Sequence, residues 1–205
     1  LSEEYADRIK IHLGVEQDSE SEIPDFDYDY IISSVHEMAR RGVSLPIDSS
    51  PELQKKLVDE LFYGSTDDFA KAYFEKVADN VARNRTDIIG HFDLVTKFNE
   101  GGKMFDENSD AYKKIVYQTL EELVISKPIF EVNTGAMTRG YRTRPYPADF
   151  ILDYVSVHGC GLVLTSDCHK KALLGGFFDE TEKRLRERGL NNIFVLTSKG
   201  FIPVK

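Results

Sequence analysis

The chain has 205 residues, 41% of them hydrophobic and 30% charged, and its formal net charge at pH 7 is −9. This length and composition argue against disorder and favour a single folded domain over residues 1–205. The acidic balance argues against nucleic-acid binding, and no apolar run approaches the roughly 18 residues that span a membrane. Two cysteines, Cys160 and Cys168, argue against a disulfide framework and favour a reducing, cytoplasmic setting.

Short apolar runs alternate along the chain with longer amphipathic segments. The runs are β-branched or aromatic and bounded by turn residues, which is typical of strands, whereas the longer segments carry apolar residues at helical spacing. The first helical segment opens with Ser50 and Pro51 and stops at Gly64, as a capped helix does. In chain order we predict strands at 8–16 and 28–36, helices at 50–64 and 65–84, a strand at 87–94, a helix at 109–126, a strand at 128–134, a helix at 147–159, a strand at 161–167, a helix at 177–189 and a strand at 192–198.

This alternation predicts an α/β fold built from βα units around a parallel sheet. Six strands in this order fit either an open, doubly wound sheet or part of a βα barrel, and the pattern alone leaves both open. In both architectures the carboxyl ends of the strands point the same way. Active sites therefore form at that end.

Carboxylate and imidazole side chains recur at the ends of the predicted strands. The polar residues found there are Glu16, His36, His91, Asp93, Glu131, Asn133, Asp167 and His169. A mixed set of imidazole and carboxylate groups suits zinc, iron or manganese, and the chain lacks the thiolates of a structural zinc site. A single strand-end His is more often a satisfied structural residue, and Asp167 alone would suit a helix N-cap. Their joint occurrence favours a metal or catalytic cluster.

Four further residues near these positions have simpler interpretations. His12 lies within the first predicted strand and is expected on the sheet face or in the core, while His158 lies in the last turn of a helix, where it favours the helix dipole. Strand alternation turns Cys168 away from its neighbours and makes it a packing residue. Asp93 either orients His91 or bonds the backbone of the next loop.

Three arginines crowd into the segment that follows the fourth predicted strand. Arg139, Arg142 and Arg144 lie close together in an otherwise acidic protein. The planar guanidinium group binds phosphate or carboxylate through two parallel hydrogen bonds. By themselves these residues would form a solvated basic loop, but beside a metal cluster a phosphate-binding role becomes equally plausible.

Several segments together resemble a known family. They are "GVE", "SSVH", "IIGHFDL", "FEVNTGAMTRGYRTRPYP" and "LTSDCHKKALLGGFF", in this order. They are similar to the polymerase-and-histidinol-phosphatase superfamily, and most similar to its histidinol-phosphatases. The Ser-Asp-x-His element is shared across the superfamily, whereas "GHFDL" and "NTGAMTRGYR" point to the histidinol-phosphatase branch.

The resemblance implies a distorted, TIM-like (β/α)7 barrel that holds two or three divalent metal ions, zinc, manganese or iron. Matched residue by residue, it implies the metal ligands Glu16, His36, His91, Asp167 and His169. The arginine segment matches the region that holds the substrate phosphate. The family begins with a strand bearing Asp-x-His-x-His, a motif that residues 1–205 do not contain. On this comparison we expect an N-terminally truncated domain that lacks one or two strands and binds fewer ions.

The function implied is hydrolysis of the phosphomonoester L-histidinol phosphate to L-histidinol and phosphate. His91, Asp167 and His169 are then the expected catalytic residues, and a small phosphorylated molecule is the expected partner. Two alternatives stay open. One is a phosphoesterase that acts on a nucleotide or another phosphometabolite, and the other is an inactive, truncated remnant.

Overall fold

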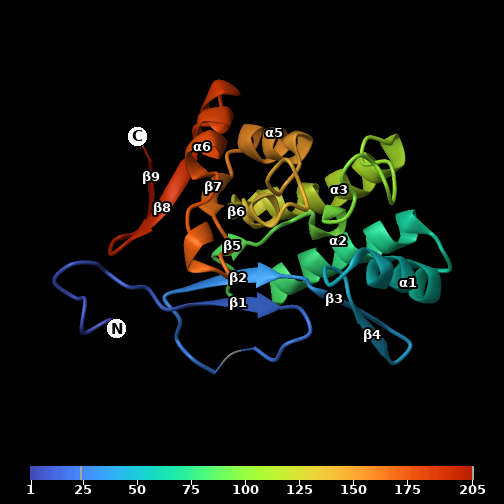
Figure 1. The fold of residues 1–205 in the computed structure, drawn as a ribbon, viewed down its shortest axis with the longest axis horizontal. Coiled ribbons are helices and arrows are strands. Elements are labelled where there is room, and N and C mark those ends of the chain that lie inside the picture. The colour runs from blue at the N-terminus through green and yellow to red at the C-terminus, as the bar shows by residue number, and fades with distance from the viewer. Residues whose placement is uncertain (24, 205) are drawn as a thin grey trace.

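The structure is a computed structural model that describes residues 1–23 and 25–204. Its centre is a seven-stranded sheet in the order β1-β2-β5-β6-β7-β8-β9, in which all neighbours are parallel except the antiparallel pair β8 and β9 (Figure 1). Its strands are β1 (Gly14–Asp18), β2 (Tyr30–Ser34), β5 (Ile88–Ile89), β6 (Ile129–Asn133), β7 (Gly161–Thr165), β8 (Ile193–Thr197) and β9 (Gly200–Pro203). The predicted α/β fold with a mostly parallel sheet is confirmed.

The helices connect successive strands and cover one face of the sheet. They are α1 (Pro51–Phe62), α2 (Thr66–Arg83), α3 (Asp110–Leu123), α4 (Gly135–Thr138), α5 (Asp149–Val157) and α6 (Phe178–Glu187). Three of them begin at a serine whose hydroxyl accepts a backbone N–H of the first turn: Ser50, Ser65 and Ser109. No helix among the described residues is long and apolar enough to cross a bilayer.

The hydrophobic core lies between this face of the sheet and helices α2, α3 and α5. Phe130 of β6 is fully buried, and its ring packs edge-on against Phe92 with the ring centres 5.6 Å apart. Phe92 in turn contacts Phe74 of α2 at 5.1 Å. Because successive strand residues alternate between faces, the neighbours of Phe130, among them Glu131, point to the opposite face. That face carries the polar side chains discussed below.

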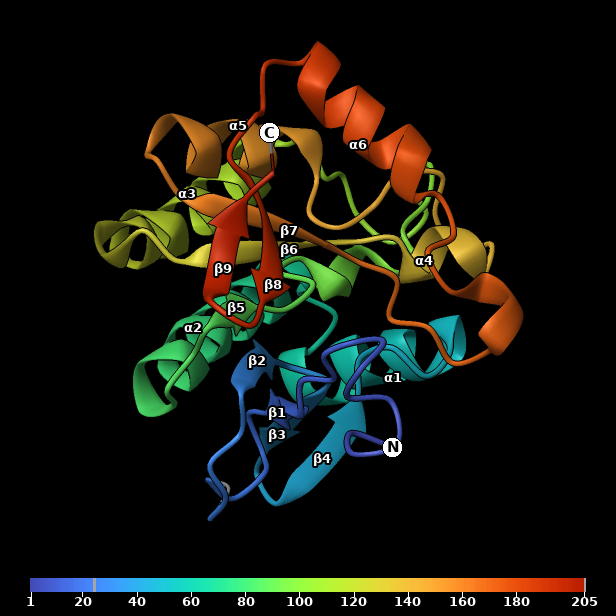
Figure 2. The same cartoon turned by 90° about the vertical axis from the view of Figure 1, so that its left-hand side faces the viewer.

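The opposite face of the sheet is concave and contains an apolar pocket. Tyr30 of β2, Val163 of β7 and Phe201 of β9 line one apolar pocket of about 360 Å³, although these strands are not neighbours in the sheet. The sheet must therefore curve, as Figure 2 also shows. No pairing between β1 and β9 closes it over residues 1–23 and 25–204, so the expected distorted TIM-like barrel is not confirmed.

Strand β5 is the shortest strand and lies near the middle of the sheet. Its ladder comprises two residue pairs on each side, so side chains complete the hydrogen bonding. Asp87 accepts the N–H of Ile31 at 2.8 Å before the strand, and Glu131 accepts the N–H of His91 at 2.5 Å after it. Gly90 between them has no room for a side chain, because a Cβ there would lie 2.2 Å from the hydroxyl of Ser34.

Several predicted boundaries are wrong. The first strand begins at Gly14, because β2 offers no partner before Tyr30, and His12 therefore lies ahead of the strand, 3.9 Å from Asp29. The sequence also concealed an antiparallel hairpin, β3 (Glu37–Arg40) and β4 (Val43–Pro46), and the edge strand β9. His158 ends α5 as expected, with Nδ1 2.7 Å from the carbonyl of Tyr154.

Candidate metal centre

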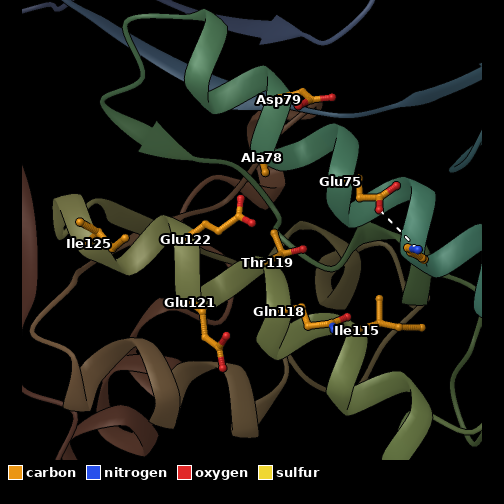
Figure 3. A pocket seen from close by; sticks show the side chains of 10 residues that line it. Glu75, Ala78, Asp79, Ile115, Gln118, Thr119, Glu121, Glu122 and Ile125 are labelled. Atoms are coloured by element: carbon orange, nitrogen blue, oxygen red, sulfur yellow. Dashed lines mark ion pairs between the residues drawn. The ribbon is translucent and has the colours of Figure 1, made fainter.

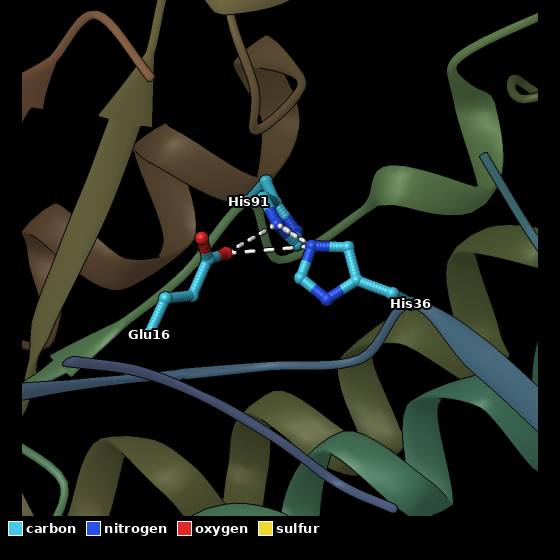
Figure 4. Close-up of side chains that lie close together, drawn as sticks. All are labelled: Glu16, His36 and His91. Carbon is cyan, nitrogen blue, oxygen red and sulfur yellow. Dashed lines mark hydrogen bonds and ion pairs between the residues drawn. The ribbon is translucent and has the colours of Figure 1, made fainter. Parts of the chain in front are cut away.

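Three predicted ligands from three different strands meet at the carboxyl end of the sheet (Figure 4). Glu16 lies in β1, His36 follows β2 and His91 follows β5. His91 Nε2 is 3.0 Å from both Glu16 Oε1 and His36 Nε2, and His36 Nε2 is 3.4 Å from the same oxygen. Two imidazole nitrogens and one carboxylate oxygen thus face a common point.

Asp18 orients His36 from the next outward position of β1. Its Oδ2 accepts the backbone N–H of His36 at 2.8 Å and lies 3.0 Å from the ring Nδ1. A proton held on Nδ1 by a carboxylate leaves the lone pair on Nε2, which is the arrangement that metal-binding histidines use. Asp18 is thus a candidate site residue that the sequence pattern did not single out. Its signal was its position two residues after Glu16, on the same face of the strand.

Glu131 holds His91 through the backbone rather than through the ring. It is buried, and its two oxygens accept the N–H of His91 and the hydroxyl of Thr165, each at 2.5 Å. The His91 ring is itself 3% exposed, and its Nδ1 has no hydrogen-bond partner among the described residues. The sequence placed Glu131 at a strand end without a role, and the structure shows that it fixes the position of His91.

The surrounding charges favour the protonated form of His91 and the ionised form of Glu16. Burial would lower the pKa of His91, but the hydrogen bond to Glu16 and the charges of Glu131, Glu16 and Asp167 raise it to about 9. Desolvation would raise the pKa of Glu16, but the hydrogen bond to His91 and the charges of His91 and His36 lower it to about 2. The carboxylates therefore give the cluster a negative potential, which the proton on His91 partly neutralises. A metal cation can replace that proton.

The donor set fits a divalent transition metal. Two neutral imidazoles and a carboxylate are ligands that zinc, iron and manganese accept. Glu16 stays 41% exposed at the side chain, so the cluster opens to solvent on one side. Because the Nε2 atoms of His36 and His91 lie 3.0 Å apart and both face Glu16 Oε1, the geometry suits a shared ion better than a purely structural contact.

Asp167 and His169, the other two predicted ligands, lie together but outside this trio. Asp167 Oδ1 is 3.0 Å from His169 Nε2, and its Oδ2 accepts a hydrogen bond from Arg139 at 2.9 Å. The His169 side chain is 74% exposed. Asp167 is close enough to His91 for its charge to contribute to the raised pKa of that ring. Both residues line a pocket of about 390 Å³ beside the trio.

The three arginines have different surroundings. Arg139 lines the same pocket and donates to the carbonyl and the carboxylate of Asp167, each at 2.9 Å. Arg142 instead turns inward, where Nη1 donates to Glu107 at 2.8 Å and to the carbonyl of Thr96 at 2.6 Å. Arg144 is exposed on the loop. Only Arg139 is thus directed toward the candidate site in this conformation.

Two open questions from the sequence are answered by contacts. Asp93 does not contact the His91 ring. Its Oδ2 accepts the N–H of Ala148 at 2.9 Å and anchors the end of the arginine loop, and burial raises its pKa to about 7. Cys168, which was expected to be a packing residue, is half-buried, and its thiol donates to the carbonyl of Lys170.

Larger hollows occur elsewhere on the surface. A groove of about 560 Å³ runs between α2 and α3, lined by acidic residues such as Glu75, Asp79, Glu121 and Glu122 (Figure 3). Its single lysine, Lys71, pairs with Glu75 at 3.8 Å. The groove contains no histidine or arginine and lies on the outer face of the helices. Size alone therefore does not locate the chemistry, whereas the converging donors do.

Sequence comparison relates the chain to histidinol-phosphatases. No protein-family model matches it. Two curated proteins, each named "Probable histidinol-phosphatase", do: that of Schizosaccharomyces pombe is 29% identical over 206 residues, and that of Deinococcus radiodurans is 24% identical over 197 residues. These alignments cover 96% and 92% of this chain but 65% and 69% of those proteins. The chain therefore spans about two thirds of the length of the curated relatives that it matches.

Structural comparison finds a similar fold in a related class of protein. A crystal structure of the candidate histidinol phosphatase hisK from Listeria monocytogenes aligns with a TM-score of 0.71 and 21% sequence identity. The alignment covers 87% of this chain and 71% of that one. Together with the two curated relatives, it confirms the resemblance to histidinol-phosphatases that the sequence motifs indicated.

Proposed function

We propose that this chain is the catalytic region of a metal-dependent phosphomonoesterase that hydrolyses L-histidinol phosphate to L-histidinol and phosphate. The observation that carries the proposal is the convergence of Glu16, His36 and His91 from three strands onto one point. Its support is the similarity of nearly the whole chain to proteins named as histidinol-phosphatases. The activity, the substrate and the phosphorylated partner are part of this proposal.

Glu16, His36 and His91 would hold one divalent ion, and Asp167 and His169 would contribute to a second position beside them. We propose two or three ions of zinc, manganese or iron for the complete site. Divalent ions in such sites lower the pKa of water and neutralise phosphate charge. The contribution of the chain is to fix the donors: Asp18 sets the His36 tautomer and Glu131 fixes the His91 backbone.

The phosphate would bind at the pocket formed by Arg139, Asp167 and His169. Arg139 presents a planar pair of N–H donors there, which match two phosphate oxygens once they exchange from Asp167. His169 lines the same pocket, so an ion held by it and Asp167 would lie where it can neutralise the charge of the departing alkoxide. Arg142 would support the loop from within, through Glu107, and Arg144 would add charge at its surface.

The arrangement of the sheet adds two further parts to the proposal. The curved sheet would belong to a distorted βα barrel, since β2, next to one edge of the sheet, and β9, at the other edge, line one apolar pocket. The domain would be a single unit over residues 1–205. Both cysteines are free, which supports a reducing, cytoplasmic setting.

Phosphate release from L-histidinol phosphate, measured with zinc, manganese and iron in turn, tests the proposal. His91→Ala removes a central ligand and should reduce turnover at least about a thousandfold, a loss of about 4 kcal/mol in transition-state stabilisation. His158→Ala, which removes an exposed helix-terminal histidine, is the matched control and should stay within twofold.

Three results would contradict the proposal. Full turnover in the His91 variant would remove the metal centre as its basis. A higher kcat/KM on nucleoside monophosphates than on L-histidinol phosphate would replace the substrate. Less than one equivalent of metal bound after loading, measured by elemental analysis, would favour a non-catalytic remnant.

A further inference from the structure

One aromatic ring lines the pocket beside the metal centre, next to several charged side chains. Tyr141 follows α4 on the arginine loop and is 42% exposed. Its neighbours around the pocket are mostly charged or polar: Arg139, Asp167, His169 and Lys170. A lone exposed aromatic residue on a convex surface would be ordinary. In a concave pocket among charged groups, it is a surface suited to the apolar part of a ligand.

The Tyr141 ring is held in place before any ligand arrives. The ring of Phe98 meets it edge-on, with centres 5.5 Å apart and planes at 87°. The ammonium group of Lys97 lies 5.2 Å from its centre and is itself anchored by the carbonyl and carboxylate of Asp48, at 2.6 and 3.0 Å.

The backbone is fixed as well. The N–H of Tyr141 donates to the carbonyl of Ala136 at 2.9 Å, and Gly140 supplies the left-handed turn with φ of 76°. A ring fixed in this way binds a ligand without losing much conformational entropy, which improves affinity. The ring is therefore preorganised as a wall of the pocket.

The size of the pocket leaves room beside a phosphate. Its volume of about 390 Å³ lies within the range of small-molecule sites, roughly 300–1,000 Å³. A phosphate is far smaller, and with Arg139 as its anchor the organic part of the ester extends along the remaining walls. The apolar surface there comes from Tyr141, Leu173 and the methyl group of Thr138.

We propose that Tyr141 is a specificity-determining residue, whose ring stacks against a planar ring in the alcohol portion of the phosphomonoester. This inference rests on the proposed phosphatase function and deepens it, because it selects esters of ring-bearing alcohols over acyclic ones. Stacking of aromatic rings depends on the ring and not on the phenol hydroxyl. Phenylalanine at this position therefore preserves the selectivity, and leucine removes it.

The experiment compares two esters that differ by the ring. L-histidinol phosphate carries an imidazole, whereas O-phosphoethanolamine keeps the phosphate and the neighbouring amine without a ring. The ratio of their kcat/KM values measures the selectivity. We expect Tyr141→Leu to lower this ratio about tenfold, equivalent to about 1.4 kcal/mol, and Tyr141→Phe to change it less than twofold. Tyr63→Leu removes a 72% exposed tyrosine at the end of α1 and serves as the matched control.

An unchanged ratio of kcat/KM values in Tyr141→Leu overturns the inference. If both kcat/KM values fall in parallel, the ratio also stays unchanged, and Tyr141 then only supports the loop. Loss of selectivity in Tyr141→Phe overturns stacking in favour of a hydroxyl contact. If the wild-type protein hydrolyses neither ester, the proposed function fails, and calorimetric binding of L-histidinol decides the inference separately. Binding about tenfold weaker in Tyr141→Leu than in wild type supports it, and equal or absent binding overturns it.

Discussion

The pair formed by His91 and Glu16 makes the stability of the metal-free protein depend on pH in a defined direction. The pKa of His91 is raised to about 9, from an ordinary value of 6.5. A base whose pKa is raised on folding stabilises the folded state fully below its unfolded pKa, and this contribution is lost as pH rises through the folded pKa. The contribution is therefore complete below about pH 6.5 and disappears above about pH 9.

The size of the effect follows from the same two pKa values. A shift from 6.5 to about 9 corresponds to about 3 kcal/mol in total, of which about 2 kcal/mol is lost between pH 7 and pH 9. For a domain of this size, that loss lowers the melting temperature by roughly 4–8 °C. The pKa of Glu16, lowered to about 2, reports the same interaction at acid pH, so its free energy is not added to that of His91. Its contribution is present above about pH 4.5 and is lost as pH falls through about 2.

Urea unfolding in the presence of a chelator, at pH 7, 8 and 9, measures this loss. Glu16→Gln is the matched control, because it keeps the size of the side chain and removes the charge that holds the proton on His91. We expect the wild-type stability to fall by about 2 kcal/mol over this range, and the stability of the variant, which keeps the charges of Glu131 and Asp167, to fall by less. A wild-type stability that stays level or rises relative to the variant between pH 7 and 9 would refute the reasoning.

Three further outcomes are expected. Zinc affinity at the cluster should fall about tenfold for each unit that pH is lowered below 8, because the His91 proton must leave, and a competition titration that shows no pH dependence would contradict this. Arg142→Ala should destabilise the protein by about 2 kcal/mol, since it leaves the part-buried Glu107 with the Asn99 amide but without a cationic partner. Arg144→Ala on the exposed loop should change stability by less than about 0.5 kcal/mol, and equal effects of the two substitutions in chemical denaturation would contradict the assignment. Ser65→Ala should cost about 1 kcal/mol because its hydroxyl caps α2, and an unchanged melting temperature would show that water replaces the cap.

The sequence predicted the parts of the fold that depend on local chemistry. Serine caps and helical stripes located α1, α2 and α3, and apolar runs located six of the seven strands of the main sheet. Strand β9 was missed because it contains Gly200 and Pro203 and forms by pairing with β8. The hairpin at 37–46 was missed because "EMARRGVSLP" shows no clear alternation of apolar and polar residues.

The same division holds for the candidate site. The rule that parallel strand ends converge brought Glu16, His36 and His91 together correctly, since it depends only on strand direction. It could not separate Asp167, because that separation depends on an ion pair with Arg139, 28 residues away. Nor could it show that Arg142 turns inward, because its partner Glu107 belongs to a different connection between strands.

The carboxylate that bridges the centre of the sheet has a consequence for which substitutions the protein tolerates. Glu131 receives two donors at once, the N–H of His91 and the hydroxyl of Thr165. An ionised carboxylate is purely an acceptor, whereas the amide of glutamine must turn its NH2 group toward one of those donors. In the usual isosteric replacement the NH2 group would face the Thr165 hydroxyl, which would have to accept this hydrogen bond and turn its own proton to another partner. At this position a change of a single atom, oxygen to nitrogen, removes a negative charge next to His91 and reverses the side-chain hydrogen bond that joins β6 to β7.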